Sequence, residues 1–305
     1  MNQQEVLVVG SANQDIVVRV DRLPKLGETI LGEDVVYLPG GKGLNQACAC
    51  GATGTRTHFL GAVGADGSGT QLLAAMRERG VDVDLTPSLD EVATGTAHIL
   101  VSANGGNQIV VVPAANSQVS EVQVQQAFAA LPDPRVLVLQ GEIPFATSLA
   151  AAELMGARGG RTVFNLAPAA EVPERLLALA DPLVVNEFEA GLILGVTPPS
   201  SRAEAAERAR ELLARSRSVI ITLGAQGSVV ADQEGTEEIA PTEVAEVVDT
   251  TGAGDAFVGV LAAELCHGQD LREAARRASL AAAQSVTRPG ASQSYGAIEA
   301  LYREA

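Results

Sequence analysis

The stretch RVLVLQGEIPFATSLAAAELMGARGGRTVFNLAP (135–168) decides the fold class of this sequence. Its first part, RVLVLQGE (135–142), has the length and apolar content of a buried strand, and a helix at about 145–157 follows it. RTVFNLAP (161–168) is then a second strand. The alternation recurs in strands at 57–64 and 218–224, in a strand that passes into a helix at 181–195, and in helices at 43–53, 69–80, 201–215, 253–268 and 271–286. These repeats predict an α/β fold with a mostly parallel sheet and helices on both faces.

Two stretches, residues 14–40 and 95–113, break this alternation because they carry β-rich runs without a helical period. The first contains IVVRV, ETIL and DVVYL between turn residues, and the second is a hairpin around the turn at 104–107. We expect them to form one small sheet that acts as a lid over the carboxyl edge of the large sheet, where ligands of open α/β sheets bind. The chain is therefore expected to be a single domain over 1–305, with this lid inserted in it.

The formal net charge of −16 on 305 residues argues against nucleic acid or an anionic membrane as the main partner. No apolar run approaches the roughly 18 residues of a membrane span. The N-terminus, MNQQEVLVVGS, lacks the basic region of a signal peptide. With Cys48, Cys50 and Cys266 expected to be buried thiols, we predict a cytoplasmic protein. An anionic ligand would need local positive potential from helix N-termini, a lysine or cations.

The segment VVDTTGAGDAFVG (247–259) carries the strongest chemical signal. Gly252, Ala253 and Gly254 lead into an apolar helix and let a phosphate approach the backbone, where free N–H groups and the helix dipole favour an anion. Asp255 lies in the first turn of that helix. Taken alone, an aspartate at a helix start is more often a cap than a catalyst. Transfer of a phosphoryl group to a hydroxyl nevertheless requires this pair, a proton acceptor beside an anion-binding site.

The segment LPGGKGLNQACACGATG (38–54) opens another helix with glycines, and it places Lys42 and Asn45 at its start. It is not a Walker A loop, because no Ser or Thr follows the lysine. A glycine turn with a solvated lysine and a close-approach site for a polyhydroxylated ligand are equally good interpretations of this segment alone.

Two further segments offer polar groups that suit a sugar. In GSANQD (10–15), Asn13 and Asp15 point the same way in an extended chain, and both can bond vicinal hydroxyls. An Asx-capped turn explains the pair equally well. In GEIP (141–144), Glu142 lies just past the strand residues RVLVLQ (135–140), at the same edge of the sheet.

The last two segments suit a nucleotide and its metal. In NEFEA (186–190), Asn186 and Glu189 share a face of a helix start and could hold a hydrated Mg²⁺, although a cap with a solvated acid is the commoner arrangement. In TLGAQG (222–227), Gly224 and Gly227 permit close contact with a nucleotide. All six segments fall where a strand ends or the next helix begins, so we expect them at one edge of one sheet.

These motifs resemble those of the PfkB family of carbohydrate kinases, and within it the ribokinase branch, along nearly the whole chain. GGKGLNQA (40–47) is similar to the first family signature and DTTGAGDAF (249–257) to the second. Further matching segments stand in the same order: GSANQD, NEFEA, TLGAQG and VTRPGA (286–291). The resemblance departs at Leu44, at NLAPA (165–169) and at Ser279, and none of these positions removes a polar sugar contact.

The resemblance implies a role for each matching position. Asp255 is implied as the catalytic base and Gly252, Ala253 and Gly254 as the anion hole. The implied sugar-binding residues are Asn13, Asp15, Gly41, Lys42, Asn45 and Glu142, with Asp255. The implied nucleotide contacts are Asn186, Thr222, Gly224, Gly227, Gly254 and Ser279. Glu189 is implied to act on Mg²⁺ through water, and an activating monovalent cation, usually K⁺, is implied at Asp249, Thr251, Ser285, Arg288, Gly290 and Ser294, several of them through backbone carbonyls.

The resemblance also implies an ATP-dependent kinase that phosphorylates D-ribose at O5, and a homodimer formed through the lid. Other expectations stay open. A PfkB kinase for deoxyribose, fructose or a nucleoside is the nearest alternative, although the lid offers little aromatic surface for a base beyond Tyr37. A sugar or nucleotide sensor without catalysis is the alternative from another class, and the intact Asp255 disfavours it.

Overall fold

The computed structural model describes residues 4–131 and 133–303, and it confirms the α/β class. Its large sheet has the strand order β15-β14-β13-β12-β11-β10-β1-β4-β6. Neighbours from β13 to β6 run parallel, whereas β14 and β15 add an antiparallel edge. The strands are β1 Glu5–Val9, β4 Arg56–Leu60, β6 Val81–Asp82, β10 Pro134–Leu139, β11 Arg161–Asn165, β12 Leu183–Asn186, β13 Val219–Thr222, β14 Ser228–Asp232 and β15 Gly235–Ile239.

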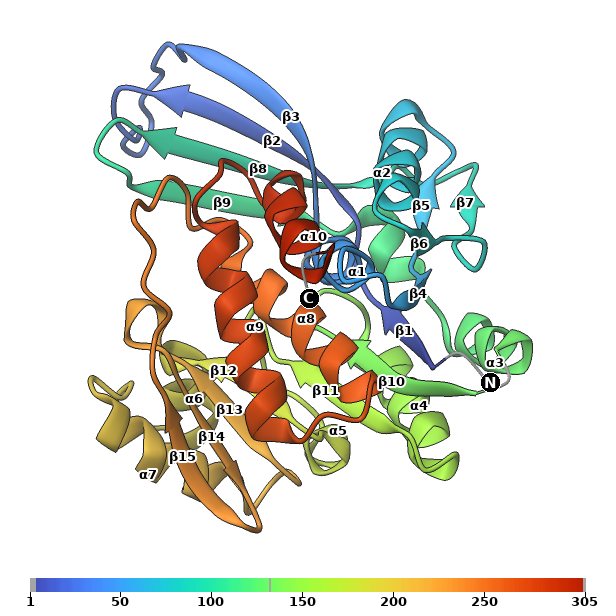
Figure 1. The fold of residues 1–305 in the computed structure, drawn as a ribbon. Helices are drawn as coiled ribbons and strands as arrows, with labels where there is room; N and C mark the ends of the chain where they lie inside the picture. The colour runs from blue at the N-terminus through green and yellow to red at the C-terminus, as the bar shows by residue number, and fades with distance from the viewer. Residues whose placement is uncertain (1–3, 132, 304–305) are drawn as a thin grey trace.

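Successive side chains of the central strands enter two separate cores, because they point to opposite faces of the sheet. Val136 and Val138 of β10 pack into one core, and Leu137 and Leu139 pack into the other. The helices divide in the same way and cover both faces (Figure 1). One face carries α1 Lys42–Gly51, α2 Gly67–Glu78, α8 Ala253–Cys266, α9 Leu271–Ser285 and α10 Gly296–Arg303; the other carries α3 Glu121–Ala130, α4 Phe145–Ala157, α5 Glu174–Leu179, α6 Glu187–Leu194 and α7 Arg202–Leu212.

Six α-helices and β-strands have no counterpart in the sequence prediction: α3, α5, α10, β15 and the two-residue strands β6 and β7 Ser88–Leu89. Helix α3 buries only Val124, Ala127 and Phe128 among its ten residues, and α5 is six residues long. An apolar period of that length is too short to identify a helix from sequence alone. These elements lie at the periphery, so their omission leaves the predicted fold class unchanged.

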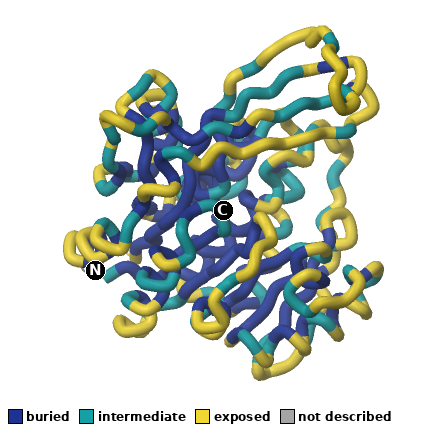
Figure 2. The backbone as a smooth tube through the Cα atoms, turned by 180° about the vertical axis from the view of Figure 1, so that it is seen from behind, coloured by how far each residue is buried: buried dark blue, intermediate teal, exposed yellow. Residues whose placement is uncertain are grey.

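The two β-only stretches pair with each other in a separate sheet of order β3-β2-β8-β9. Its strands are β2 Asn13–Val20, β3 Asp34–Gly40, β8 Gly95–Ser102 and β9 Asn107–Val112, and two short strands, β5 Val63–Gly64 and β7 Ser88–Leu89, pair elsewhere. Strands β2 and β8 run parallel, which joins the two excursions. Figure 1 shows this small sheet as a layer of its own, and Figure 2 shows that it is mostly exposed or half-buried, whereas the large sheet is buried.

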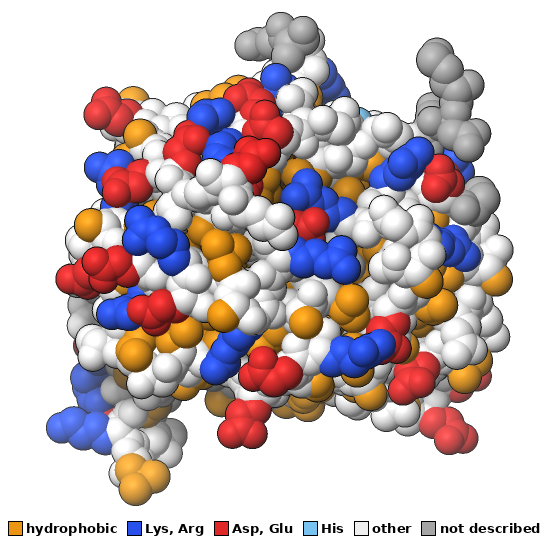
Figure 3. Space-filling model, turned by 90° about the horizontal axis from the view of Figure 1, so that it is seen from below, with side chains coloured by type: hydrophobic (Ala, Val, Ile, Leu, Met, Phe, Trp, Pro, Cys, Tyr) orange, Lys and Arg blue, Asp and Glu red, His pale blue; other side chains and the backbone are white. Residues whose placement is uncertain are grey.

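The surface carries both signs of charge despite the net charge of −16. Figure 3 shows acidic and basic side chains interspersed over the face seen from below. No helix within residues 4–131 and 133–303 is long and apolar enough to cross a membrane. Burial raises the pKa of Cys48 and Cys50 to about 12 and that of Cys266 to about 11, so these three buried residues are thiols at neutral pH.

Candidate active site

The start of α1 is built into the chain that leaves β1. A Cβ added at Gly43 would lie 2.5 Å from the backbone nitrogen of Ser11, and one at Gly41 would lie 2.8 Å from that of Asn13. Gly41 also has φ +90°, a conformation that favours glycine. These two glycines therefore let the turn before α1 pack directly against the segment that follows β1.

Side chains close the N-terminus of α1. The carboxylate of Glu142 accepts hydrogen bonds from the Ser11 hydroxyl (2.5 Å) and from the backbone N–H of Lys42 (3.2 Å). The Ser11 hydroxyl oxygen accepts from the N–H of Gly43 (3.3 Å). Glu142 therefore lies beside the glycine-lysine turn, and it joins the end of β10 to the start of α1.

Asp255 lies in the first turn of α8 and is 8% exposed. Its Oδ2 accepts from Asn45 Nδ2 at 3.0 Å, and its Oδ1 accepts from Gln46 Nε2 at 2.9 Å. These partners are 210 and 209 residues away in the chain. The structure thus brings the acid of the second glycine-rich segment against the helix that follows the first one.

The charge of Asp255 acts on both Lys42 and Asp15. Burial lowers the pKa of Lys42, but the carboxylates of Asp255, Glu142 and Glu189 outweigh it, so the pKa is raised and the ammonium is retained. Burial, together with the charges of Glu142 and Asp255, raises the pKa of Asp15 to about 7. A group of acids around one lysine is therefore present at the base of the small sheet.

Asn13 and Asp15 are the first and third residues of β2, so they belong to the small sheet and not to the end of β1 as predicted. Both occupy space that a glycine leaves: Gly95 adjoins the Asn13 Oδ1, and Gly40 adjoins the Asp15 carboxylate. Asn116 fixes the amide of Asn13, because its Nδ2 donates to Asn13 Oδ1 at 2.7 Å. Asn13 is thereby held in one orientation.

The start of α8 is open, in contrast to that of α1. Its N-cap is Gly252, with φ +76° and no side-chain cap. A Cβ added at Gly254 would meet nothing within 4 Å, so this position faces free space. Tyr295 supports the turn from behind, since its hydroxyl donates to the Gly252 carbonyl at 2.9 Å. An uncapped helix N-terminus with room in front of it suits an anion.

Asn186 and Glu189 form a reciprocal cap at the start of α6. Asn186 Oδ1 accepts from the N–H of Glu189, and Glu189 Oε2 accepts from the N–H of Asn186, both at 2.8 Å. Burial raises the pKa of Glu189. The capping interpretation therefore holds for the observed contacts, and the second carboxylate oxygen of Glu189 does not take part in this cap.

The predicted nucleotide positions lie along the end of β13 and on α9. Thr222 donates to the Val185 carbonyl at 3.4 Å. Gly224 faces open space, whereas a Cβ at Gly227 would lie 2.2 Å from the Ile239 carbonyl oxygen. Ser279 is half-buried on α9, which packs against β14 and β15.

The predicted cation positions lie in two segments, 249–251 and 285–294, that bond to each other. Asp249 accepts from the N–H and hydroxyl of Thr251 through Oδ1 and from the N–H of Gly290 through Oδ2. Although burial raises the pKa of Asp249, these bonds outweigh it and leave the pKa lowered. Ser285 and Ser294 donate their hydroxyls to carbonyls of their own segments, and Arg288 is exposed. No cluster of three His, Cys, Asp or Glu side chains suited to a metal ion occurs in the described part of the chain.

Sequence reasoning missed the polar residues that support this site. Gln46, Asn116, Gln140 and Asn165 are all buried and all contact a predicted site residue or one another. The available signal was a polar residue inside an apolar run, as in VLVLQ (136–140), because a buried amide requires a partner.

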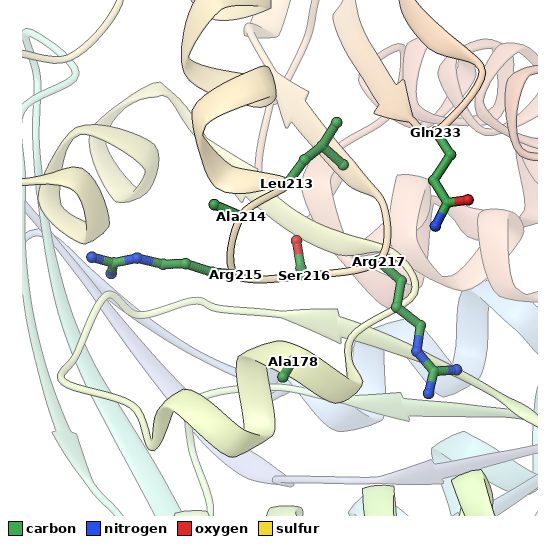
Figure 4. A pocket seen from close by; sticks show the side chains of 7 residues that line it. All are labelled: Ala178, Leu213, Ala214, Arg215, Ser216, Arg217 and Gln233. Carbon is green, nitrogen blue, oxygen red and sulfur yellow. The ribbon is translucent and has the colours of Figure 1, made fainter.

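A hollow of about 310 Å³ lies away from these residues, lined by Ala178, Leu213, Ala214, Arg215, Ser216, Arg217 and Gln233. Residues 213–217 precede β13, so the hollow lies at the amino edge of the large sheet. Figure 4 shows Arg215 and Arg217 extending in opposite directions. The polar groups do not converge, so this hollow is not a candidate active site.

Comparison with known proteins supports the motif assignment. Residues 3–297 match the model of the pfkB family carbohydrate kinases. The ribokinase of Mus musculus is 37% identical over 297 residues, which cover 95% of this chain and 91% of the mouse protein. The ribokinase of Haemophilus influenzae is 34% identical over 299 residues, which cover 96% and 95%. The structure of Arabidopsis thaliana ribokinase complexed with ribose and ATP matches with a TM-score of 0.88 and 29% identity over 98% of this chain and 99% of that one. The chain therefore belongs to the pfkB family of carbohydrate kinases, and the resemblance carried by its two glycine-rich segments is confirmed.

Proposed function

We propose that this protein transfers the γ-phosphoryl group of ATP to O5 of D-ribose, giving ADP and D-ribose 5-phosphate. One observation carries the proposal: Asp255 lies at the open N-terminus of α8 and is bonded to Asn45 of the glycine-lysine segment at 3.0 Å. A proton acceptor, an anion-binding helix start and a set of polar side chains suited to a sugar thus adjoin one another. The relatives from Mus musculus and Haemophilus influenzae are named ribokinases, and the similar Arabidopsis thaliana ribokinase was solved with ribose and ATP, which supports this pair of substrates.

The residues support a direct displacement. Asp255 accepts the proton of the sugar hydroxyl while the hydroxyl oxygen forms its bond to the γ-phosphorus, and the bond from that phosphorus to ADP breaks. Asn45 has a buried Oδ1 without a partner among the described residues, so it can accept a hydrogen bond from the sugar. Asn13, Asp15, Lys42 and Glu142 complete the proposed sugar site.

The start of α8 fits the triphosphate of ATP, because no side chain caps its first turn and Gly254 faces free space. Lys42 supplies a cation in a chain of net negative charge. We place the nucleoside along Asn186, Thr222, Gly224, Gly227 and Ser279.

Glu189 fits a role on Mg²⁺ through water, because one of its carboxylate oxygens does not take part in the cap. When bound, Mg²⁺ would offset phosphate charge. The segments of Asp249, Thr251, Ser285, Arg288, Gly290 and Ser294 offer carbonyl and hydroxyl oxygens that suit K⁺, and a cation there would add positive charge near the start of α8. We also propose a cytoplasmic location, because the three cysteines are free thiols.

The small sheet is our candidate for both a lid and a homodimer interface. Tyr37, Ile109, Val110 and Val112 expose 61%, 54%, 64% and 46% of their surface. Exposed apolar side chains on an edge strand favour pairing with another chain. Light scattering should give the mass of a dimer, and Val110→Lys should give that of a monomer. A monomeric parent protein would contradict the dimer.

A panel of sugars, compared by kcat/KM with Mg²⁺ and ATP, with and without K⁺, tests the function. We expect ribose to give the highest value and K⁺ to raise it. Higher values for deoxyribose, fructose or a nucleoside would assign another substrate within the family. Sugar binding in calorimetry without ATP consumption would indicate a sensor.

A further inference from the structure

A chain of buried amides contacts Asp255. Gln46 and Gln140 are 0% and 1% exposed, and Asn165 is 8% exposed. Gln46 Nε2 donates to Asp255 Oδ1 at 2.9 Å and to Asn165 Oδ1 at 3.0 Å. Gln140 Nε2 donates to Gln46 Oε1 at 2.8 Å. Both atoms of the Gln46 amide are therefore bonded.

This chain permits only one orientation of the Gln46 amide. Asn165 Nδ2 donates to the backbone carbonyl of Val184 at 3.1 Å, which can only accept, so Asn165 Oδ1 must face Gln46. Turning the Gln46 amide would place its oxygen against two acceptors, Asp255 Oδ1 and Asn165 Oδ1. Nε2 of Gln46 is thus fixed toward Asp255.

We infer that Gln46 is a positioning residue that reserves Oδ1 of Asp255 and leaves Oδ2 as the oxygen that receives the proton. Each oxygen of Asp255 accepts one amide N–H, so a proton on either would meet a donor unless that donor can turn. The Gln46 amide is held by Asn165 and Gln140, whereas Oδ1 of Asn45 has no partner among the described residues, so the Asn45 amide is free to turn its oxygen toward a proton on Oδ2. In the proposed reaction the hydroxyl proton passes to Oδ2 while the oxygen–phosphorus bond forms. The inference rests on the proposed function, because it concerns the same proton transfer.

Two substitutions of Gln46 test the inference in the full-length protein. Gln46→Met keeps the approximate size and removes the donor, and Gln46→Glu keeps the shape and presents an acceptor to Asp255. We expect kcat to fall about 10- to 100-fold in Gln46→Met and further in Gln46→Glu, as for other supporting residues of a reacting group. Ribose affinity, measured by calorimetry without ATP, should stay within about threefold of the parent value.

Gln140→Met is the matched control one step further away. It should lower kcat less than Gln46→Met, and the double variant should be no slower than Gln46→Met alone, because Gln140 acts only through Gln46. Additive losses would show two independent structural effects and would overturn the inference. Thermal unfolding of all variants identifies any that do not fold, and the kcat values of the folded variants still test the inference.

The outcomes separate this inference from the function on which it rests. Absence of ribose-dependent ATP turnover in the parent protein would remove the proposed function and the inference with it. Turnover by the parent together with an unchanged kcat in Gln46→Met or Gln46→Glu would overturn the inference alone. Loss of ribose affinity in parallel with kcat would also overturn it, since Gln46 would then shape the sugar site.

Discussion

The starts of α1 and α8 are both glycine-rich, yet their surroundings differ. At α1, Gly43 lies against the Ser11 backbone, and Ser11 and Glu142 take up the N–H groups of Lys42 and Gly43. At α8, Gly252 carries no side-chain cap and Gly254 faces open space. Gly43 thus permits close packing at the first helix, whereas Gly254 leaves room for a ligand at the second. The same residue type therefore does not by itself identify a phosphate site.

The largest effect is expected from the acid at the α8 start. Asp255→Asn should lower kcat by about 10²–10⁴-fold, because the amide cannot accept the hydroxyl proton, and should retain ribose binding in calorimetry. Asp270→Asn is the control, since Asp270 caps α9 by accepting from the N–H of Glu273 outside the site. Near-normal turnover of Asp255→Asn would contradict the assigned role.

One added methyl group at each helix start tests the comparison directly. Gly254→Ala should lower kcat/KM for ATP by about 10-fold, since the methyl occupies space proposed for phosphate, while the melting temperature stays near that of the parent. Gly43→Ala should instead destabilise the fold by about 1–3 kcal/mol, because its Cβ would lie 2.5 Å from Ser11 nitrogen. Thermal unfolding measures the stability of each variant, and ATP kinetics measure its kcat/KM. Equal changes in both quantities for the two variants would contradict the proposed difference between the two helix starts.

The acids around the α1 start predict a dependence of stability on pH. The pKa of Asp15 is about 7 in the folded protein, above its ordinary value of 3.8, so the folded state binds the proton more tightly. The resulting cost is absent near pH 4, grows as the pH rises toward 7, and is complete above it.

Asp15→Asn removes that cost. Its melting temperature should exceed that of the parent by a few degrees at pH 8, and the difference should disappear toward pH 4. Thermal unfolding across this range checks the prediction. A difference independent of pH would show that the Asp15 carboxylate does not titrate as described.

The smallest effect is expected at Ser11. Ser11→Ala removes the donor to Glu142 and the acceptor of the Gly43 N–H, and should lower the free energy of unfolding by about 1 kcal/mol, measured in urea. Glu142 retains the N–H of Lys42, so the loss is limited. An unchanged stability would show that water replaces the hydroxyl and that the α1 start is less closed than described.

Sequence patterns predicted those elements whose formation depends on residues close together in the chain. The apolar runs of β10 and β11 and the glycines before α8 were identified because strand period and helix-start chemistry involve neighbours in sequence. Gln46, Gln140 and Asn165 were missed because each looks like an ordinary polar residue until its partner is known. The same limit applies to Asn116, whose contact with Asn13 spans 103 residues.

The sequence by itself determined the α/β class, the separate small sheet and the family, since these follow from period, composition and two signatures. Only the tertiary structure decided that Asp255 meets Asn45 and Gln46, that α1 is closed at its start, and that α8 is open. The reason is physical: a hydrogen bond across 210 residues depends on which strands become neighbours in the sheet, and no pattern within either segment specifies that order.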